Sequence, residues 1–192
     1  MTNWCQNRLE VHGNDCLLMA WRTAQWGPSP DYGPQIQHLS FHAQVPVPQE
    51  VMARGYGTGG LPEFQRAIQI QTGQQDPTPH LPLDRAAWQT AYWGSSRDAS
   101  DVTFTEGPGQ LVFSFATAWA PPVPWLETVA ALWPALSFEL SSIEPGNDLY
   151  VHMRLEAGSI VSFDERAPTL QDLQDWGYDS DKEFDPAAIS TS

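Results

Sequence analysis

Lysine is almost absent from this chain of 192 residues, in which Lys182 is the only one. Lys and Arg together number nine against 23 Asp and Glu, which gives a formal net charge of -14 at pH 7. Such a chain lacks a basic surface for phosphate backbones, and it repels polyanions over a Debye length of about 8 Å in cellular salt. We therefore expect no direct nucleic-acid binding. The charge favours a basic protein partner, and plain solubility is the other explanation.

Cysteines and long apolar segments are also scarce. The two cysteines, Cys5 and Cys16, are too few for a disulfide framework. No segment approaches the roughly 18 apolar residues that a membrane span requires, and the first residues contain no basic segment followed by an apolar one. We therefore expect a cytoplasmic protein that is not attached to a membrane. Hydrophobic residues still make up 41% of the chain and include nine tryptophans, which is enough for a folded core.

Signatures of metal binding and catalysis are missing as well. Cys5 and Cys16 are not arranged as C-x-x-C, and His38 and His42 fall on a predicted strand at residues 38–45, about 13 Å apart. The chain contains no G-x-S-x-G segment, and no glycine-rich phosphate loop follows a predicted strand. We therefore expect no bound metal, no cofactor and no conventional enzyme.

The order of the predicted elements indicates an α+β fold. Period-two alternation predicts strands, and 3.6-residue periodicity with capping residues predicts helices. The strands are at residues 3–11, 38–45, 102–106, 110–117, 137–142, 150–156 and 159–163, and the helices at 16–26, 84–94 and 123–133. In the first strand we take Trp4, Leu9 and Val11 as apolar anchors. This order fits a ferredoxin-like antiparallel sheet with helices packed on one face.

The chain divides into one domain at residues 1–163 and an acidic tail at residues 164–192. Residues 49–82 contain many glycines and prolines, so we expect an irregular insertion with at most one helix at 63–71. We expect the tail to be partly docked through a short helix that carries Leu170, Leu173 and Trp176, and otherwise disordered. Six of its acids are candidates for binding a partner: Asp172, Asp175, Asp179, Asp181, Glu183 and Asp185.

Trp119 stands between the strand at 110–117 and a helix, with three prolines at positions 121 to 124. Prolines fix the backbone, so a rigid packing corner is the favoured interpretation. The alternative is a recognition surface, because a tryptophan offers a rigid contact area and an indole N–H. In that case Trp119 joins Trp93, Arg97 and Glu144 at one end of the sheet. If the site were catalytic, Arg97 would hold an anion and Glu144 would act as a base.

Four segments resemble a family of phage and plasmid proteins, the YubB-like proteins with a ferredoxin-like domain. They are NWCQNRLEV at 3–11, LSFHAQVPVPQEV at 39–51, TAYWGSSRDASDV at 90–102, and FSFATAWAPPVPWLETVAALWPALSFELSSIEPGND at 113–148. Many relatives have W-G-T-K-W-[DN] in the third segment, where this chain lacks the lysine and the second tryptophan. The resemblance implies a ferredoxin-like fold and a mobile-element setting, and it implies no reaction.

Charge and resemblance together predict an accessory protein of a phage or plasmid that binds a host protein. One purpose would be to inhibit a defence system, as anti-restriction and anti-CRISPR proteins do. An acidic surface fits a basic, nucleic-acid-binding groove of such a partner. The alternative is a small-molecule-binding protein, or an uncharacterised enzyme, with a site at the sheet end near Trp93 and Trp119.

Overall fold

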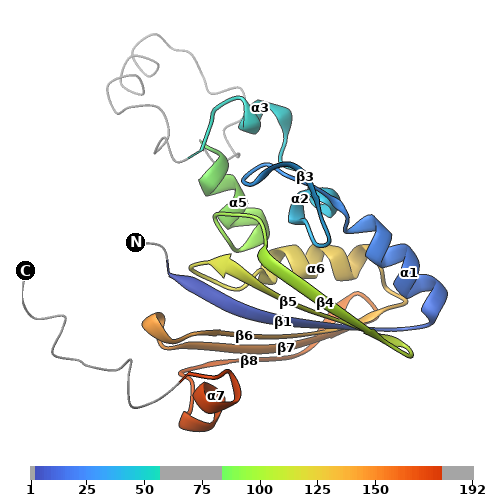
Figure 1. Cartoon of the computed structure of the whole chain (residues 1–192), viewed down its shortest axis with the longest axis vertical. Helices are drawn as coiled ribbons and strands as arrows, with labels where there is room; N and C mark the ends of the chain where they lie inside the picture. Colours follow the sequence, from blue (N-terminus) through green and yellow to red (C-terminus); the bar gives the residue numbers. More distant parts are fainter. Residues whose placement is uncertain (1–2, 57–83, 179–192) are drawn as a thin grey trace, which may run out of the picture.

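The computed structural model describes residues 3–56 and 84–178, and its centre is a six-stranded antiparallel sheet (Figure 1). The strand order is β4-β5-β1-β6-β7-β8. The strands are β1 Trp4–His12, β4 Ser100–Gly107, β5 Gln110–Ala118, β6 Ser137–Glu144, β7 Leu149–Glu156 and β8 Ser159–Arg166. A separate two-stranded sheet pairs β2 Gly27–Ser29 with β3 Gly33–Gln37. The helices are α1 Asp15–Ala24, α2 Phe41–Gln44, α3 Gln49–Met52, α5 Arg85–Trp93, α6 Val123–Leu132, the 3-10 helix η1 Pro145–Asn147 and α7 Leu170–Asp175.

The central four strands have the ferredoxin-like topology. Along the chain the order is β1, α1, β4, β5, α6, β6, and in the sheet these strands lie as β4-β5-β1-β6 with antiparallel neighbours. That is the β-α-β-β-α-β arrangement of this fold. β7 and β8 continue the sheet beyond β6 as antiparallel neighbours. The predicted α+β fold with an antiparallel sheet is therefore confirmed.

α1, α2, α5 and α6 lie on one side of the sheet, and the core is between them and the strands (Figure 1). Strand alternation places Leu9 and Val11 of β1 in this core, both fully buried. The ring centroid of Trp21 in α1 lies 5.5 Å from that of Phe113 in an edge-to-face contact. Such aromatic contacts add about 0.5–1.5 kcal/mol beyond area burial. The core is thus an aromatic layer that fixes α1 on the sheet.

The opposite side of the sheet carries charged residues of both signs. Within β1, Arg8 Nε lies 3.0 Å from Glu10 Oε1. Between β7 and β6, His152 Nε2 lies 2.9 Å from Glu139 Oε1. Arg154 also pairs with Glu156 on β7, at 2.6 Å. Exposed pairs of this kind contribute little to stability, about 0–1 kcal/mol each. Their consequence is electrostatic, because these acids are matched by bases and this side is not a uniformly acidic surface.

The predicted strand at residues 38–45 is wrong. β3 ends at Gln37, and Phe41–Gln44 form the short helix α2. The Asp98 carboxylate accepts a hydrogen bond from the Phe41 amide at 2.6 Å, and this contact turns the chain where a strand would have continued. His38 and His42 consequently do not share a strand face. His38 packs between aromatic rings, and His42 Nδ1 accepts a hydrogen bond from the Val47 amide at 3.1 Å.

The tail predicted from residue 164 begins inside the sheet, because β8 runs to Arg166, and the helix that the sequence predicts follows as α7. α7 follows β8 and lies beside it, on the side of the sheet away from α6 (Figure 1). Thr169 and Asp172 form a reciprocal capping box at its start. The predicted helix at residues 63–71 lies outside the described residues. Over residues 3–56 and 84–178, no helix combines the length and apolarity that crossing a membrane requires.

Candidate binding site at one end of the sheet

Trp119 lies at the end of the sheet where β5 leaves and β1 begins. Trp4 is the register partner of Ala118, and the Trp119 amide donates a hydrogen bond to the Asn3 carbonyl at 2.9 Å. The ladder between β1 and β5 therefore continues one residue beyond the strands. Glu144, at the end of β6, belongs to the same end of the sheet because β1 and β6 are antiparallel neighbours.

The backbone of Trp119 has a conformation that bulky residues rarely adopt. Its φ is +72°, in the left-handed region, and such a conformation costs on the order of 1–3 kcal/mol. The Thr117 hydroxyl donates to the Ala120 carbonyl at 2.8 Å and fixes the bend, while Pro121 and Pro122 are buried beside it. The result is an indole that is 46% exposed. The prolines pack as predicted, but the tryptophan points outward.

Trp4 is a second exposed tryptophan at this corner, with 39% of its surface accessible. The prediction that it anchors the core is wrong. Leu9 and Val11 occupy odd positions of β1 and face the helices, so the even position of Trp4 places it on the other side of the sheet. That parity is visible in the sequence and would have identified it. We call Trp4 and Trp119 together the tryptophan corner.

Backbone strain gathers at the same end of the sheet. Four non-glycine residues have positive φ in the described parts of the chain, and three of them lie here: Asp101 is the second residue of β4, Trp119 follows β5, and Asp148 precedes β7. The fourth, Ala157, is in the turn between β7 and β8. Residues in sparsely populated conformations cluster at functional sites, because surrounding structure has to maintain them. The strain therefore marks this end as the candidate site.

Glu144 lies beneath the corner rather than on it. It is 4% exposed, and Oε1 accepts a hydrogen bond from the Gly146 amide at 3.1 Å, which caps the 3-10 helix η1. Within residues 3–56 and 84–178, its Oε2 is buried without a hydrogen-bond partner. The side-chain amide of Asn3 packs against Gly146 next to it. This is the geometry of a helix cap. A general base would need its carboxylate to be accessible to a substrate, and the Glu144 carboxylate is buried.

A buried polar cluster supports the strand ends from the helix side. The Asn7 amide donates to Thr117 Oγ1 at 2.8 Å and accepts from the Ser142 hydroxyl at 2.8 Å, joining β1, β5 and β6. Cys5 is fully buried next to it, and burial raises the pKa of its thiol to about 12. The thiol is therefore protonated at physiological pH and unreactive. The N-W-C-x-N segment thus fixes the strands in place.

The side chain of Trp93 points into the core. It is fully buried, its Nε1 donates to the Val45 carbonyl at 2.9 Å, and its ring makes an edge-to-face contact with Phe41. The next residue, Gly94, has φ +84°, and a Cβ there would lie 2.6 Å from the Pro121 carbonyl oxygen. This close approach brings the end of α5 to the proline corner. The backbone at Trp93 is therefore near the tryptophan corner, while its indole is not part of it.

Arg97 belongs to a different cluster. Its guanidinium carbon lies 4.8 Å from the centroid of the Tyr56 ring, on which Arg85 also stacks at 5.1 Å. Arg85 in turn pairs with the buried Asp31 at 3.2 Å. The four residues predicted to form one site are therefore not brought together. Trp119 and Glu144 lie at the same end of the sheet, on strands separated by β1, whereas the side chains of Trp93 and Arg97 turn elsewhere.

Two of the six predicted tail acids lie in the described residues. Asp172 accepts hydrogen bonds from Arg166 at 2.6 and 3.2 Å, and the Arg166 guanidinium holds the pKa of Asp172 well below its usual range. Arg166 also stacks on Tyr150, 4.3 Å from the ring centroid, so this pair ties α7 to the sheet. Asp175 accepts from the Gln171 side chain at 2.7 Å. Asp179, Asp181, Glu183 and Asp185 lie outside the described residues.

The part of the chain that the structure describes contains no group of three or more His, Cys, Asp and Glu side chains suited to a metal ion. No family model matches the chain, and no curated protein matches it. Its fold does match a solved structure, the crystal structure of the protein api92 from Yersinia pseudotuberculosis, which is assigned to the family model DUF1281. The TM-score is 0.54 at 10% sequence identity, over 88% of this chain and 99% of that one. At this identity the likeness shows the α+β fold alone, and the YubB-like resemblance stays a prediction.

Proposed function

We propose that this protein is a non-catalytic accessory protein that binds another protein through the tryptophan corner. The observation that carries the proposal is Trp119, whose indole is 46% exposed on a backbone held at φ +72°. Keeping Trp119 in this conformation costs stability twice, because its backbone is strained and its ring is not buried. Tryptophan is also the residue most enriched among side chains that dominate binding energy at protein interfaces.

The chemistry around the corner favours a basic partner. Asp101 and Asp148 are exposed on either side of Trp119 and Trp4, and the chain as a whole carries -14. Complementary charge raises the association rate and selects the partner, while Trp119 supplies affinity when its indole becomes buried in the interface. We therefore expect a partner with an apolar pocket surrounded by Lys and Arg. Nucleic-acid-binding host proteins have such surfaces, and the YubB-like resemblance makes a restriction or CRISPR component the first candidate.

Replacing Trp119 by glycine separates binding from folding. Glycine adopts a positive φ freely, so we expect Trp119→Gly to leave stability unchanged or raise the melting temperature by about 2–4 °C. Loss of a central interface tryptophan costs about 2 kcal/mol or more, so affinity for the partner should fall at least about 30-fold. The partner is identified as the protein retained by wild type and lost by Trp119→Gly in a pull-down from host lysate, and its affinity is then measured with purified proteins.

Trp26 provides the matched control, because it is 41% exposed and lies after α1, outside the corner. Trp26→Ala should change the affinity for that partner by less than about threefold, because residues outside an interface contribute little to its binding energy. If wild type and Trp119→Gly retain the same proteins at the same affinity, the corner is not the binding surface. Trp4→Ala should weaken binding in the same direction as Trp119→Gly.

The acidic tail is the second contact of this proposal. Truncation after Tyr178 removes Asp179, Asp181, Glu183 and Asp185 but keeps α7 and the Arg166–Asp172 pair. We expect this truncation to weaken binding several-fold and to flatten its dependence on salt, because exposed charges act mainly through screened, long-range attraction. Far-ultraviolet circular dichroism and the melting temperature should be unchanged. An unaltered salt dependence would assign the charge effect to Asp101 and Asp148 instead.

A further inference from the structure

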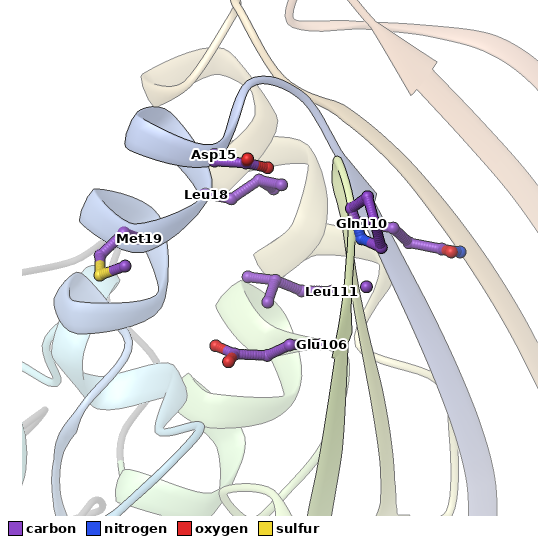
Figure 2. A pocket seen from close by; sticks show the side chains of 8 residues that line it. Asp15, Leu18, Met19, Glu106, Gln110 and Leu111 are labelled. Atoms are coloured by element: carbon purple, nitrogen blue, oxygen red, sulfur yellow. The ribbon is translucent and has the colours of Figure 1, made fainter.

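A cavity of about 340 Å³ lies between α1 and the β4–β5 hairpin, at the end of the sheet opposite the tryptophan corner (Figure 2). Its floor is formed by Leu18 and Leu111, which are both buried. Met19, which is 61% exposed, and Pro108 form part of its rim. The volume is at the lower end of the range of small-ligand sites, roughly 300–1,000 Å³. It suits one small organic group and is too small for a folded element.

Two carboxylates enter this cavity from opposite walls. Figure 2 shows Asp15 extending from α1 toward the hairpin, and Glu106 extending from β4 toward α1. One oxygen of Asp15, Oδ1, accepts a hydrogen bond from the Gly109 amide at 3.1 Å, which holds the carboxylate in place. None of the described residues that line the cavity is basic. The cavity therefore combines an apolar floor with a carboxylate on each of two walls, of which that of Glu106 is also paired with Arg22.

Glu106 also shows which cation this environment accepts. Its Oε1 pairs with Arg22, whose guanidinium carbon lies 5.5 Å from the Trp26 ring and 5.6 Å from the Phe104 ring. A guanidinium is thus already held between a carboxylate and apolar rings at the edge of the cavity. Because Glu106 shares its charge with Arg22, Asp15 is the stronger anchor for a second cation.

We propose that the cavity binds an organic monocation, a guanidinium or ammonium group on an alkyl stem. The stem would pack on Leu18 and Leu111, with the flexible Met19 adapting to its shape. The charged head would form charge-assisted hydrogen bonds with Asp15 and Glu106. A divalent metal ion held by two carboxylates keeps most of its hydration shell and gains nothing from an apolar floor, whereas an alkyl stem does. The cation is either a free small amine or the side chain of an arginine or lysine in a partner.

Butylguanidine is the probe for the free molecule, and butylurea is its uncharged counterpart of similar shape. We expect butylguanidine to shift the amide resonances of α1 and the β4–β5 hairpin in a titration, and butylurea to shift them at least about tenfold more weakly, as loss of one strong ion pair implies. Asp15→Asn keeps an acceptor for the Gly109 amide but removes the charge, and should weaken butylguanidine binding by about tenfold. Equal binding of the two probes, or shifts confined to other regions, would overturn the proposal.

Glu127→Gln is the control, since Glu127 is an exposed acid on α6 and does not line the cavity. It removes the same net charge and should leave butylguanidine binding within about twofold, because exposed distant charges are screened. If Glu127→Gln weakens butylguanidine binding as much as Asp15→Asn does, the effect comes from the net charge of the protein, and the proposed site is refuted. The two sources are distinguished with a blocked Gly-Arg-Gly peptide: tighter binding than butylguanidine assigns the cavity to a partner's side chain, and weaker binding assigns it to a free amine. These residues are separate from the tryptophan corner, so either proposal can fail alone.

Discussion

Trp93→Ala is expected to lower the free energy of unfolding by about 3–5 kcal/mol, because it empties the centre of the aromatic core. Trp93 is fully buried, its ring contacts Phe41 and Trp88, and its Nε1 donates to the Val45 carbonyl at 2.9 Å. A domain of this size is stable by only about 5–15 kcal/mol, so this variant should lose a large part of its stability. Urea denaturation followed by tryptophan fluorescence and by circular dichroism measures the change.

Two further variants test the reason for that loss. Trp93→Phe keeps much of the apolar volume but leaves the Val45 carbonyl without its donor, so we expect an intermediate loss of about 1–3 kcal/mol. Trp119→Ala, at an exposed tryptophan, should change stability by less than about 1 kcal/mol. A Trp93→Ala variant as stable as wild type would show that its indole is not a core side chain, and would return Trp93 to the candidate site.

The centre of the sheet was predictable because buried positions alternate along β1 and along the first part of β5. In β1 and β5, buried apolar residues such as Leu9, Val11, Phe113 and Phe115 recur at every second position, and this period alone specifies a half-buried strand. The glycines of the hairpin and the prolines before α6 then give the element order. Alternation also places Trp4 on the side away from the helices, so the parity of its position predicts its exposure better than its apolar residue type does.

The site was less predictable, because its residues differ in ways that only tertiary contacts decide. Trp93 and Trp119 each stand next to a turn, yet one indole is fully buried and the other is 46% exposed. What separates them is the positive φ of Trp119, which the Thr117–Ala120 hydrogen bond maintains. In the same way, α2 replaced the predicted strand at 38–45 because of Asp98, a residue 57 positions from Phe41. No local pattern reports a contact at that separation.

Asp98 should also make the stability of this protein depend on pH in a direction unusual for a carboxylate. It is fully buried, and burial raises its pKa from 3.8 to about 6. Four donors oppose that shift without cancelling it: the amides of Phe41 and Ala99 at 2.6 and 2.9 Å, the Ser40 hydroxyl at 2.8 Å, and the Ser29 hydroxyl. Between pH 4 and 6 the folded state therefore binds a proton that the unfolded state has released. Through this group, stability falls as the pH rises across that window.

Asp98→Asn isolates this effect from the other titrating groups. Asparagine has the shape of the protonated carboxyl, and its oxygen can accept from the Phe41 and Ala99 amides. Its NH₂ can donate to Ser40 Oγ if the Ser40 proton turns from Asp98 to the Pro28 carbonyl, which lies 3.3 Å from Ser40 Oγ. The rise of the Asp98 pKa from 3.8 to about 6 corresponds to about 3 kcal/mol. We therefore expect the stability of Asp98→Asn relative to wild type to rise by about 3 kcal/mol between pH 4 and pH 7.5.

Chemical denaturation of both proteins at pH values from 4 to 8 measures that difference, and groups that titrate alike in both cancel from it. Asp98→Ala is the companion variant, because it leaves the same donors buried without an acceptor at every pH and should be destabilised by about 3 kcal/mol or more at pH 4. Stability curves that run parallel for wild type and Asp98→Asn would mean that Asp98 titrates at its ordinary pKa in the fold. An Asp98→Asn variant that is less stable than wild type by a constant amount from pH 4 to pH 8, with a deficit that shrinks as the pH falls below 4, would show the opposite linkage, with the carboxylate stabilised by its donors more than it is penalised by burial.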